Sequence, residues 1–226
     1  MREAVSQEYP VLRRRSLVRW ILAGAAVQLC SPAIRTAAQN AIPIGSPVPG
    51  LEQLFPDERE LPAGVELESA GTREEVAQIA GTFRNSRDAA QLLSGWDWAG
   101  NAYRSYGASV GAGSATPVRV EISIDQFASS TGAAYALSYF AHDWAVVLQR
   151  HEAVGETLLP CEAMVTGDGS ATRFLRRGNL VVRVTVVMPE PAPAEADTIA
   201  LTAATDLALA VLANAEDLGL QRSATC

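Results

Sequence analysis

Strict alternation of apolar and polar residues marks the clearest predicted strand, at 118–125. The apolar positions are Val118, Val120, Ile122 and Ile124, and the polar ones are Arg119, Glu121, Ser123 and Asp125. Because successive side chains of a strand point to opposite faces, this pattern predicts one buried and one solvated face, typical of an antiparallel sheet. A second region, 171–188, is predicted to be a β-hairpin with Gly178-Asn179 as its turn.

Apolar residues that recur every three or four positions predict the helices. The capping-box sequence 72-TREE-75 precedes one such run, with Thr72 as the helix cap, and a second short helix can begin at Asn85 or Ser86. The strongest pattern covers 130–150. The last one, about 195–215, is apolar nearly all round, which predicts a buried helix.

The order of these elements predicts an α+β domain, with a mostly antiparallel sheet and helices packed on one face. Two strand–strand–helix units are visible, at 98–150 and 171–215. A further short strand is expected at 63–70, whereas 151–170 is ambiguous. We expect a single α+β domain at 63–220.

The first 38 residues carry the features of an export signal. Arg13, Arg14 and Arg15 precede a short apolar run, 20-WILAGAAVQL-29, and small residues follow it. The run is too short to span a bilayer, which takes about 20 apolar residues. Residues 14–19 also resemble a twin-arginine signal, with an ordinary secretion signal as the alternative. We therefore expect 1–38 to be a signal peptide and the protein to be exported, extracytoplasmic or secreted.

Export changes the charge of the chain. Residues 1–38 hold six Arg and two Glu, so the remainder carries 12 Arg, no Lys and 23 acidic residues, a net charge of −11. Such an acidic domain is a poor partner for a phosphate backbone or an anionic lipid surface. We expect no nucleic-acid partner and no stable membrane span after signal removal. Five prolines at 39–62 predict a linker before the domain.

Candidate catalytic chemistry is sparse. The histidines are His142 and His151, nine residues apart near one predicted helix, so they face opposite ways and disfavour a shared metal site. No nucleophile-elbow, phosphate-loop, dinucleotide or calcium-loop pattern is present. Asp97, between Trp96 and Trp98, is a candidate proton donor if the rings exclude water, and a solvent-facing turn residue otherwise. We assign no catalytic residue, cofactor or metal.

Two features favour a ligand site. In 95-GWDWAGNAYRSYG-107, exposed rings would stack on a sugar or a quaternary ammonium, whereas buried rings would only seal the core. On the 171–188 hairpin, arginines share the face that continues onto 118–125, where they would bind an anion or pair with Glu121 and Asp125. The candidate ligand-binding residues are Trp96, Trp98, Tyr103, Arg104, Arg176 and Arg183.

Cys161 and Cys226 are the two cysteines that remain after signal removal. In an oxidising compartment they are candidates for one disulfide, which would tie the C-terminus to the domain. Two separate thiols are the alternative, because a chain terminus is often poorly ordered.

Several segments of the chain resemble uncharacterised exported domains of high-GC bacteria. They are Trp98, 101-NAY-103, residues 120–140 and 179-NLVVRV-184, within a region of about 60–215. The resemblance implies an extracytoplasmic α+β domain and assigns no activity or site residue. We expect a non-enzymatic domain that binds a small ligand or an envelope protein. The alternatives are an exported hydrolase-type enzyme that uses carboxylates or His142, and a structural envelope component.

Overall fold

The computed structural model describes residues 50–113, 115–155, 160–192 and 195–219. All of them belong to one of the two compact units of the chain, Ala41–Cys226; the other unit is Met1–Asn40. The predicted signal peptide, 1–38, lies outside the described residues, so it stays a prediction.

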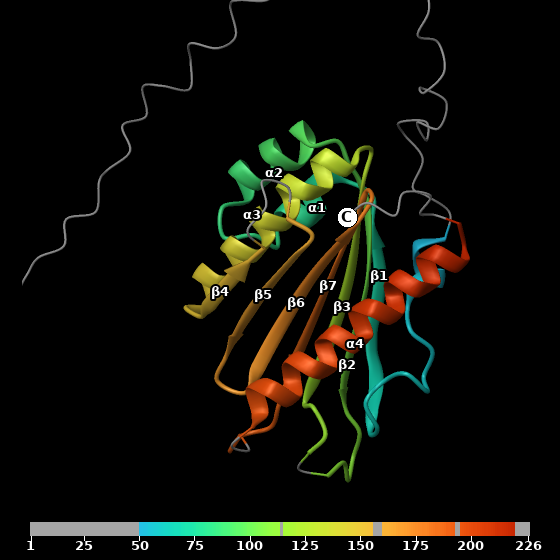
Figure 1. Cartoon of the computed structure of the whole chain (residues 1–226), viewed down its shortest axis with the longest axis vertical. Helices are drawn as coiled ribbons and strands as arrows, with labels where there is room; N and C mark the ends of the chain where they lie inside the picture. Colours follow the sequence, from blue (N-terminus) through green and yellow to red (C-terminus); the bar gives the residue numbers. More distant parts are fainter. Residues whose placement is uncertain (1–49, 114, 156–159, 193–194, 220–226) are drawn as a thin grey trace, which may run out of the picture. The chain divides into compact units, whose positions relative to one another are not determined.

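The described part contains one antiparallel sheet of seven strands, in the order β1-β2-β3-β7-β6-β5-β4 (Figure 1). The strands are β1 (Val65–Arg73), β2 (Trp98–Ala108), β3 (Arg119–Phe127), β4 (His151–Val154), β5 (Glu162–Gly167), β6 (Ser170–Arg177) and β7 (Leu180–Val187). The α+β class with a mostly antiparallel sheet is confirmed. So is the β6–β7 hairpin, whose turn residue Gly178 has a φ of 57°. The ambiguous region 151–170 forms β4 and β5.

The helices in the described part follow the periodic patterns closely. They are the short 3-10 helix η1 (Leu51–Leu54) and the α-helices α1 (Val76–Ala80), α2 (Ser86–Gly95), α3 (Ser130–Leu148) and α4 (Ala196–Asp217). Thr72 does not cap α1, because it belongs to β1, which pairs with β2 as far as Arg73 opposite Asn101. Glu75 caps the helix instead, and Gln78 completes the capping box. The strand hydrogen bonds override the local helix signal.

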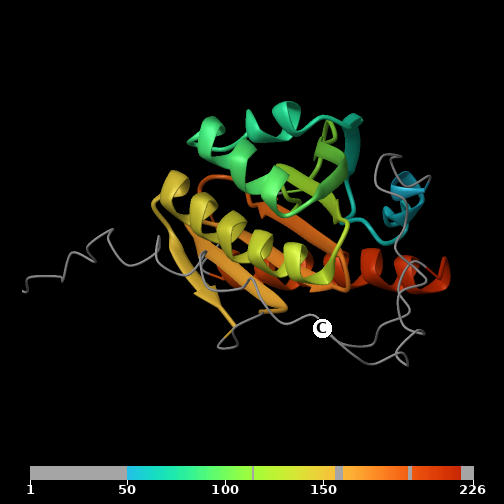
Figure 2. The same cartoon turned by 90° about the horizontal axis from the view of Figure 1, so that it is seen from above.

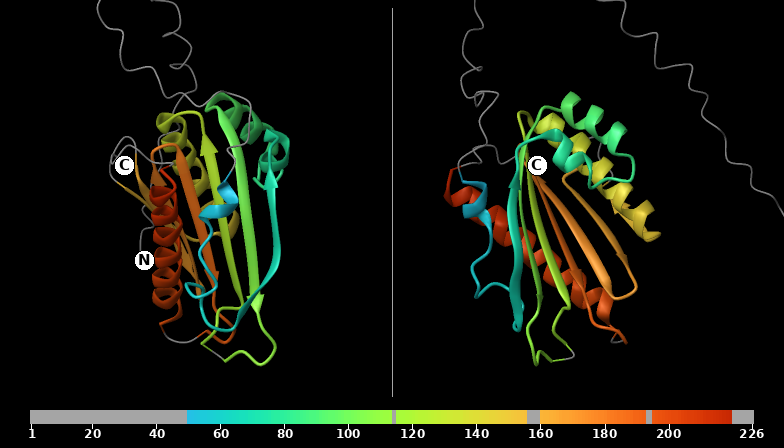
Figure 3. Two further views of the ribbon diagram at one scale, coloured as in Figure 1. Left: turned by 90° about the vertical axis from the view of Figure 1, so that its right-hand side faces the viewer. Right: turned by 180° about the vertical axis from the view of Figure 1, so that it is seen from behind.

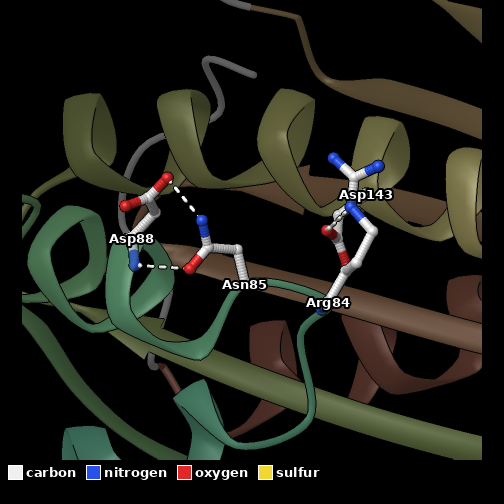
Figure 4. Close-up of polar contacts among 4 residues, drawn as sticks. All are labelled: Arg84, Asn85, Asp88 and Asp143. Atoms are coloured by element: carbon white, nitrogen blue, oxygen red, sulfur yellow. Dashed lines mark hydrogen bonds and ion pairs between the residues drawn. The ribbon is translucent and has the colours of Figure 1, made fainter.

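Polar contacts join the α1–α2 region to α3 (Figure 4). Asn85 caps α2: its Oδ1 accepts a hydrogen bond from the backbone N–H of Asp88 at 3.3 Å, and its Nδ2 donates to Asp88 Oδ2 at 2.7 Å. The neighbouring Arg84 donates its backbone N–H to Asp143 Oδ2 at 3.4 Å, and its Nε lies 4.0 Å from Oδ1. Asp143 is a buried residue of α3, so these contacts hold α2 against α3.

Helices cover both faces of the sheet, which corrects the prediction that they pack on one face. Figures 1 and 2 show α4 on one face and α1, α2 and α3 on the other. The core under α4, which we call the first core, includes Val120, Ile122, Ile124, Val182, Val184, Ala204, Leu207 and Val211. The second core, under α3, includes Trp98, Phe127, Leu137, Phe140, Phe174 and Val181. Because Leu180, Val181 and Val182 are buried in succession, β7 needs a covering layer on each side.

The predicted solvated face of 118–125 is solvated only at one end, where Arg119 is exposed and Glu121 partly exposed. Ser123 and Asp125 lie on that face and are each only 3% exposed. Neither is buried by apolar packing alone, because each has a hydrogen-bond partner on β2. Buried polar groups with partners are common in sheets, and alternation cannot distinguish them from solvated ones.

Part of the predicted linker, 39–62, belongs to the packed domain. Leu51, Leu54 and Phe55 are buried in the first core. Asn214 of α4 donates a hydrogen bond through Nδ2 to the carbonyl oxygen of Leu54 at 3.2 Å. The described core therefore begins near residue 51 rather than 63.

The helix α4 is, within the described residues, the one helix long and apolar enough to cross a membrane by length and composition. The core helix of a soluble protein passes the same test, and α4 packs on the sheet through Ala200, Ala204 and Leu207. The expectation that no stable membrane span remains after signal removal stays a prediction.

The start of α3 supplies the first testable prediction. A Cβ at Gly132 would lie within 3.0 Å of the carbonyl oxygen of Trp96, a backbone atom that cannot swing away. Alanine normally favours a helix over glycine by about 1 kcal/mol. Here the helix must shift, so we expect Gly132→Ala to lower the free energy of unfolding by about 1–3 kcal/mol. Urea denaturation measures it. The exposed neighbour Thr131→Ala is the control, and a stabilised Gly132→Ala chain would contradict the contact.

Candidate functional site

An open groove lies on the face of the sheet that carries α3. The helix covers the β4–β7 side of this face, and the view from behind shows parts of β1, β2 and β3 without a helix over them (Figure 3, right). The groove has a volume of about 350 Å³. We call it the sheet groove. Its lining residues are Glu68, Ser69, Arg73, Tyr103, Arg104, Ser105, Arg119, Glu121, Ile122, Ser123 and Arg183.

The strand register sets which side chains meet in the groove. Tyr103 lies opposite Ser123, which in turn lies opposite Arg183. Two residues along the strands, Ser105 lies opposite Glu121. Side chains on one face recur every second residue, about 6.6–6.8 Å apart along a strand. We call these two sets of neighbours the arginine row and the glutamate row.

Arg183 supplies a cation in the arginine row. Its guanidinium carbon lies 4.6 Å from the centroid of the Trp144 ring. Its Nε is buried, and within the described residues it has no hydrogen-bond partner. Burial lowers the pKa of Arg183, the nearby Asp125 and Glu121 raise it, and Arg73 lowers it. An arginine nevertheless stays protonated in proteins, so the groove contains a cation with an N–H donor that no described residue satisfies.

Arg73 and Tyr103 form the β1 side of the groove. The guanidinium carbon of Arg73 lies 4.0 Å from the Tyr103 ring centroid, and its Nη1 donates to Asn101 Oδ1 at 2.5 Å. The Tyr103 ring lies over Gly71, where an added Cβ would be 2.9 Å from the tyrosine hydroxyl oxygen. Gly71 therefore leaves room for the ring, and the ring holds Arg73 in place.

A buried polar network lies next to the groove, on the same face. Asn101 Nδ2 donates to Ser123 Oγ at 2.8 Å, and Trp98 Nε1 donates to Asp125 Oδ1 at 3.0 Å. Burial raises the pKa of Asp125, although the Trp98 hydrogen bond, the charges of Arg183 and Arg73 and the Ser123 hydrogen bond each lower it. The network fixes Asn101, and through it Arg73.

Two carboxylates lie at the other end of the groove. Glu121 has a side chain that is 30% exposed, and its Oε1 lies 3.5 Å from Arg119 Nη1. Arg119 is largely exposed, so this ion pair contributes little. The carboxylate of Glu68 lies across Gly107, where an added Cβ would collide with it. Both carboxylates of the groove thus lie at this end, together with Arg119, whereas Arg73 and Arg183 lie at the other.

Three of the six candidate ligand-binding residues line the groove: Tyr103, Arg104 and Arg183. The guanidinium carbon of Arg104, however, lies 4.4 Å from the ring centroid of Phe55, in the first core. Trp98 is buried in the second core and donates its hydrogen bond to Asp125, and neither residue lines the groove. Our strand-based prediction had missed Arg73 and Glu68, because only the pairing of β1 with β2 places them there.

The other two candidates lie away from the groove. Trp96 is the C-cap of α2 rather than a strand residue, so it shares no strand face with Trp98. Its ring stacks on Tyr135 of α3, with centroids 6.4 Å apart. Arg176 is 6% exposed, and its Nε donates to the carbonyl oxygen of Pro160 at 3.1 Å. This contact holds the start of β5 against β6.

The residues proposed for catalysis also lie outside the groove. His142 is exposed on α3, with Nδ1 3.2 Å from Glu152 Oε2. Asp97 is exposed in the turn between α2 and β2. Within the described ranges, no three His, Cys, Asp or Glu residues are grouped so as to hold a metal. Cys226 lies outside those ranges, so its disulfide with Cys161 stays a prediction.

Comparison with known proteins assigns no family. No family model and no curated protein matches the chain. Among solved structures, the extracellular domain of PknH from Mycobacterium tuberculosis is similar, with 11% identity and a TM-score of 0.47 over 74% of this chain and 95% of that one. A likeness this weak carries no inference about activity, ligand or location. The described geometry defines an α+β domain with an arginine-bearing groove on an antiparallel sheet.

Proposed function

We propose that this chain is an exported, non-enzymatic binding domain whose sheet groove takes a small ligand with a carboxylate. The observation that carries the proposal is Arg183: it lines the groove, and its Nε has no hydrogen-bond partner among the described residues. A guanidinium binds a carboxylate through two parallel hydrogen bonds, and such charged bonds are among the strongest in proteins.

The charges of the groove favour a carboxylate over a phosphate. Arg73 and Arg183 attract an anion, while Glu68 and Glu121 lie in the same groove. A doubly charged phosphate doubles both the repulsion from the acids and the attraction to the arginines, but its desolvation cost rises with the square of its charge. The mixed lining therefore supports a ligand with one negative charge at its arginine-binding end.

The geometry supports binding rather than hydrolysis. A serine nucleophile requires a base within hydrogen-bond reach. Ser105 and Ser123 are in the groove, but its lining residues include no histidine, and His142 pairs with Glu152 elsewhere. A groove without a serine–histidine pair favours reversible binding.

An NMR titration tests the proposal. Amide spectra of the full ¹⁵N-labelled chain would be followed with acetate and, separately, with inorganic phosphate. We expect acetate to shift amides of β2, β3 and β7 around the groove and to bind more tightly than phosphate. Arg183→Met keeps an apolar stem against Trp144 but removes the charge, so acetate should bind about tenfold more weakly, a loss of about 1.4 kcal/mol.

Arg177→Met is the matched control. It removes an arginine from the same hairpin, but Arg177 Nη1 pairs with Glu216 Oε2 at 3.2 Å, outside the groove. This variant should bind acetate as the native chain does. Acetate binding that survives Arg183→Met unchanged, tighter binding of phosphate, or no shift around the groove would each contradict the proposal.

A further inference from the structure

We infer that the ligand of the sheet groove is a zwitterion of the α-amino-acid type, with its carboxylate on Arg183 and its ammonium on Glu121. The inference rests on the proposed carboxylate-binding function and goes beyond it by naming the second charged group of the ligand.

The first support is the polarity of the groove. A site for a simple carboxylate gains nothing from acids in its wall, because each repels the ligand. Here Glu121 and Glu68 both line the groove, Glu121 one side-chain repeat from the row of Arg183, and the cation beside Glu121 is the largely exposed Arg119. An ammonium group is the ligand feature that converts this repulsion into attraction.

The second support is the availability of Glu121 for a ligand. The nearest cation, Arg119 Nη1, is 3.5 Å from its Oε1, longer than a charge-assisted hydrogen bond of about 2.7–2.9 Å. The side chain of Arg119 is 58% exposed and can turn toward solvent. Ser105, opposite Glu121, offers a hydroxyl oxygen as a second acceptor. An ammonium has three N–H donors, and these two side chains can accept two of them.

The third support is the spacing of the two rows. The arginine row and the glutamate row are one side-chain repeat apart, about 6.6–6.8 Å along the strand. In an α-amino acid a single carbon separates the carboxylate from the ammonium. Arg183 on β7 and Glu121 on β3 are diagonal neighbours, about 7–8 Å apart. The charged head of the ligand, with one charge-assisted hydrogen bond of about 2.7–2.9 Å at each end, spans roughly 8–9 Å. The head of an α-amino acid therefore fits between Arg183 and Glu121.

Glycine, acetate and methylamine test this arrangement, because they share the charged groups and have no side chain to complicate the comparison. The full ¹⁵N-labelled chain would be titrated with each at neutral pH and low salt. We expect glycine to bind at least about fivefold more tightly than acetate, and methylamine to bind most weakly. In Glu121→Gln, glycine should lose this advantage while acetate binds at least as well as before.

Glu162→Gln is the matched control, because Glu162 is also a strand carboxylate paired with an arginine, Arg173, but does not line the groove. It should leave the glycine-to-acetate ratio unchanged. Equal binding of glycine and acetate, or a glycine advantage that survives Glu121→Gln, would overturn the zwitterion inference. If acetate still binds through Arg183 in that case, the carboxylate proposal stands. If neither acetate nor glycine shifts the groove, both proposals fall.

Discussion

Replacing Phe174 with alanine is expected to lower the free energy of unfolding by about 3–5 kcal/mol. Phe174 is fully buried in the second core, and it lies directly opposite Arg183 in the β6–β7 register. Its removal leaves a cavity between the sheet and α3 that neither can close without moving. Urea denaturation followed by circular dichroism measures the loss as a lower midpoint with an unchanged slope.

Tyr135→Ala is the control for this substitution. Tyr135 belongs to α3, the helix that packs over Phe174, but its side chain is 51% exposed and stacks on the ring of Trp96. An exposed aromatic pair contributes about 0.5–1.5 kcal/mol, so this variant should lose no more than that. If Phe174→Ala lost as little as Tyr135→Ala, α3 would not pack on β6 as described.

Replacing Asp125 with asparagine is expected to change how stability depends on pH. Burial raises the pKa of Asp125 above its ordinary value of 3.8. Between that value and the raised pKa, the folded chain binds more protons than the unfolded chain. The contribution of Asp125 to the free energy of unfolding therefore falls as pH rises through this window and is constant above it.

Asparagine cannot ionise, so the Asp125→Asn chain should lack this contribution. Its amide oxygen still accepts the hydrogen bond from Trp98 Nε1. We expect the stability of the variant relative to the native chain to rise with pH across the window. Urea midpoints over a series of pH values measure it. Asp168→Asn, which removes an exposed carboxylate, controls for net charge. If the stability of Asp125→Asn relative to the native chain fell with rising pH, the charges of Arg183 and Arg73 would lower the pKa of Asp125 by more than burial raises it.

The candidate site was only partly accessible to sequence reasoning. Alternation on the hairpin correctly put Arg183 on the opposite face from Leu180 and Val182, and next to β3. Arg73 and Glu68, which complete the groove, come from an edge strand that begins more than 30 residues before its partner β2. Their place depends on the pairing of two distant segments, and no local pattern encodes that pairing.

The sequence by itself determined the elements whose signals are local. The periodic apolar positions of α3 and α4, the alternation of β3 and the Gly178-Asn179 turn all depend on neighbours within about seven residues. Such patterns state which residues of one element share a face, because the helix and strand repeats are fixed by backbone geometry.

Only the tertiary structure decided what covers each face. Alternation put Asp125 on the other face of β3 from Ile124, and that face could have been solvated or buried. The hydrogen bond from Trp98 made Asp125 part of a buried polar network. Likewise, nothing local placed α4 on the face opposite α3, or drew Leu54 into the core. These outcomes depend on which distant surfaces bury the most apolar area and satisfy the most polar groups together, and that is a property of the whole chain.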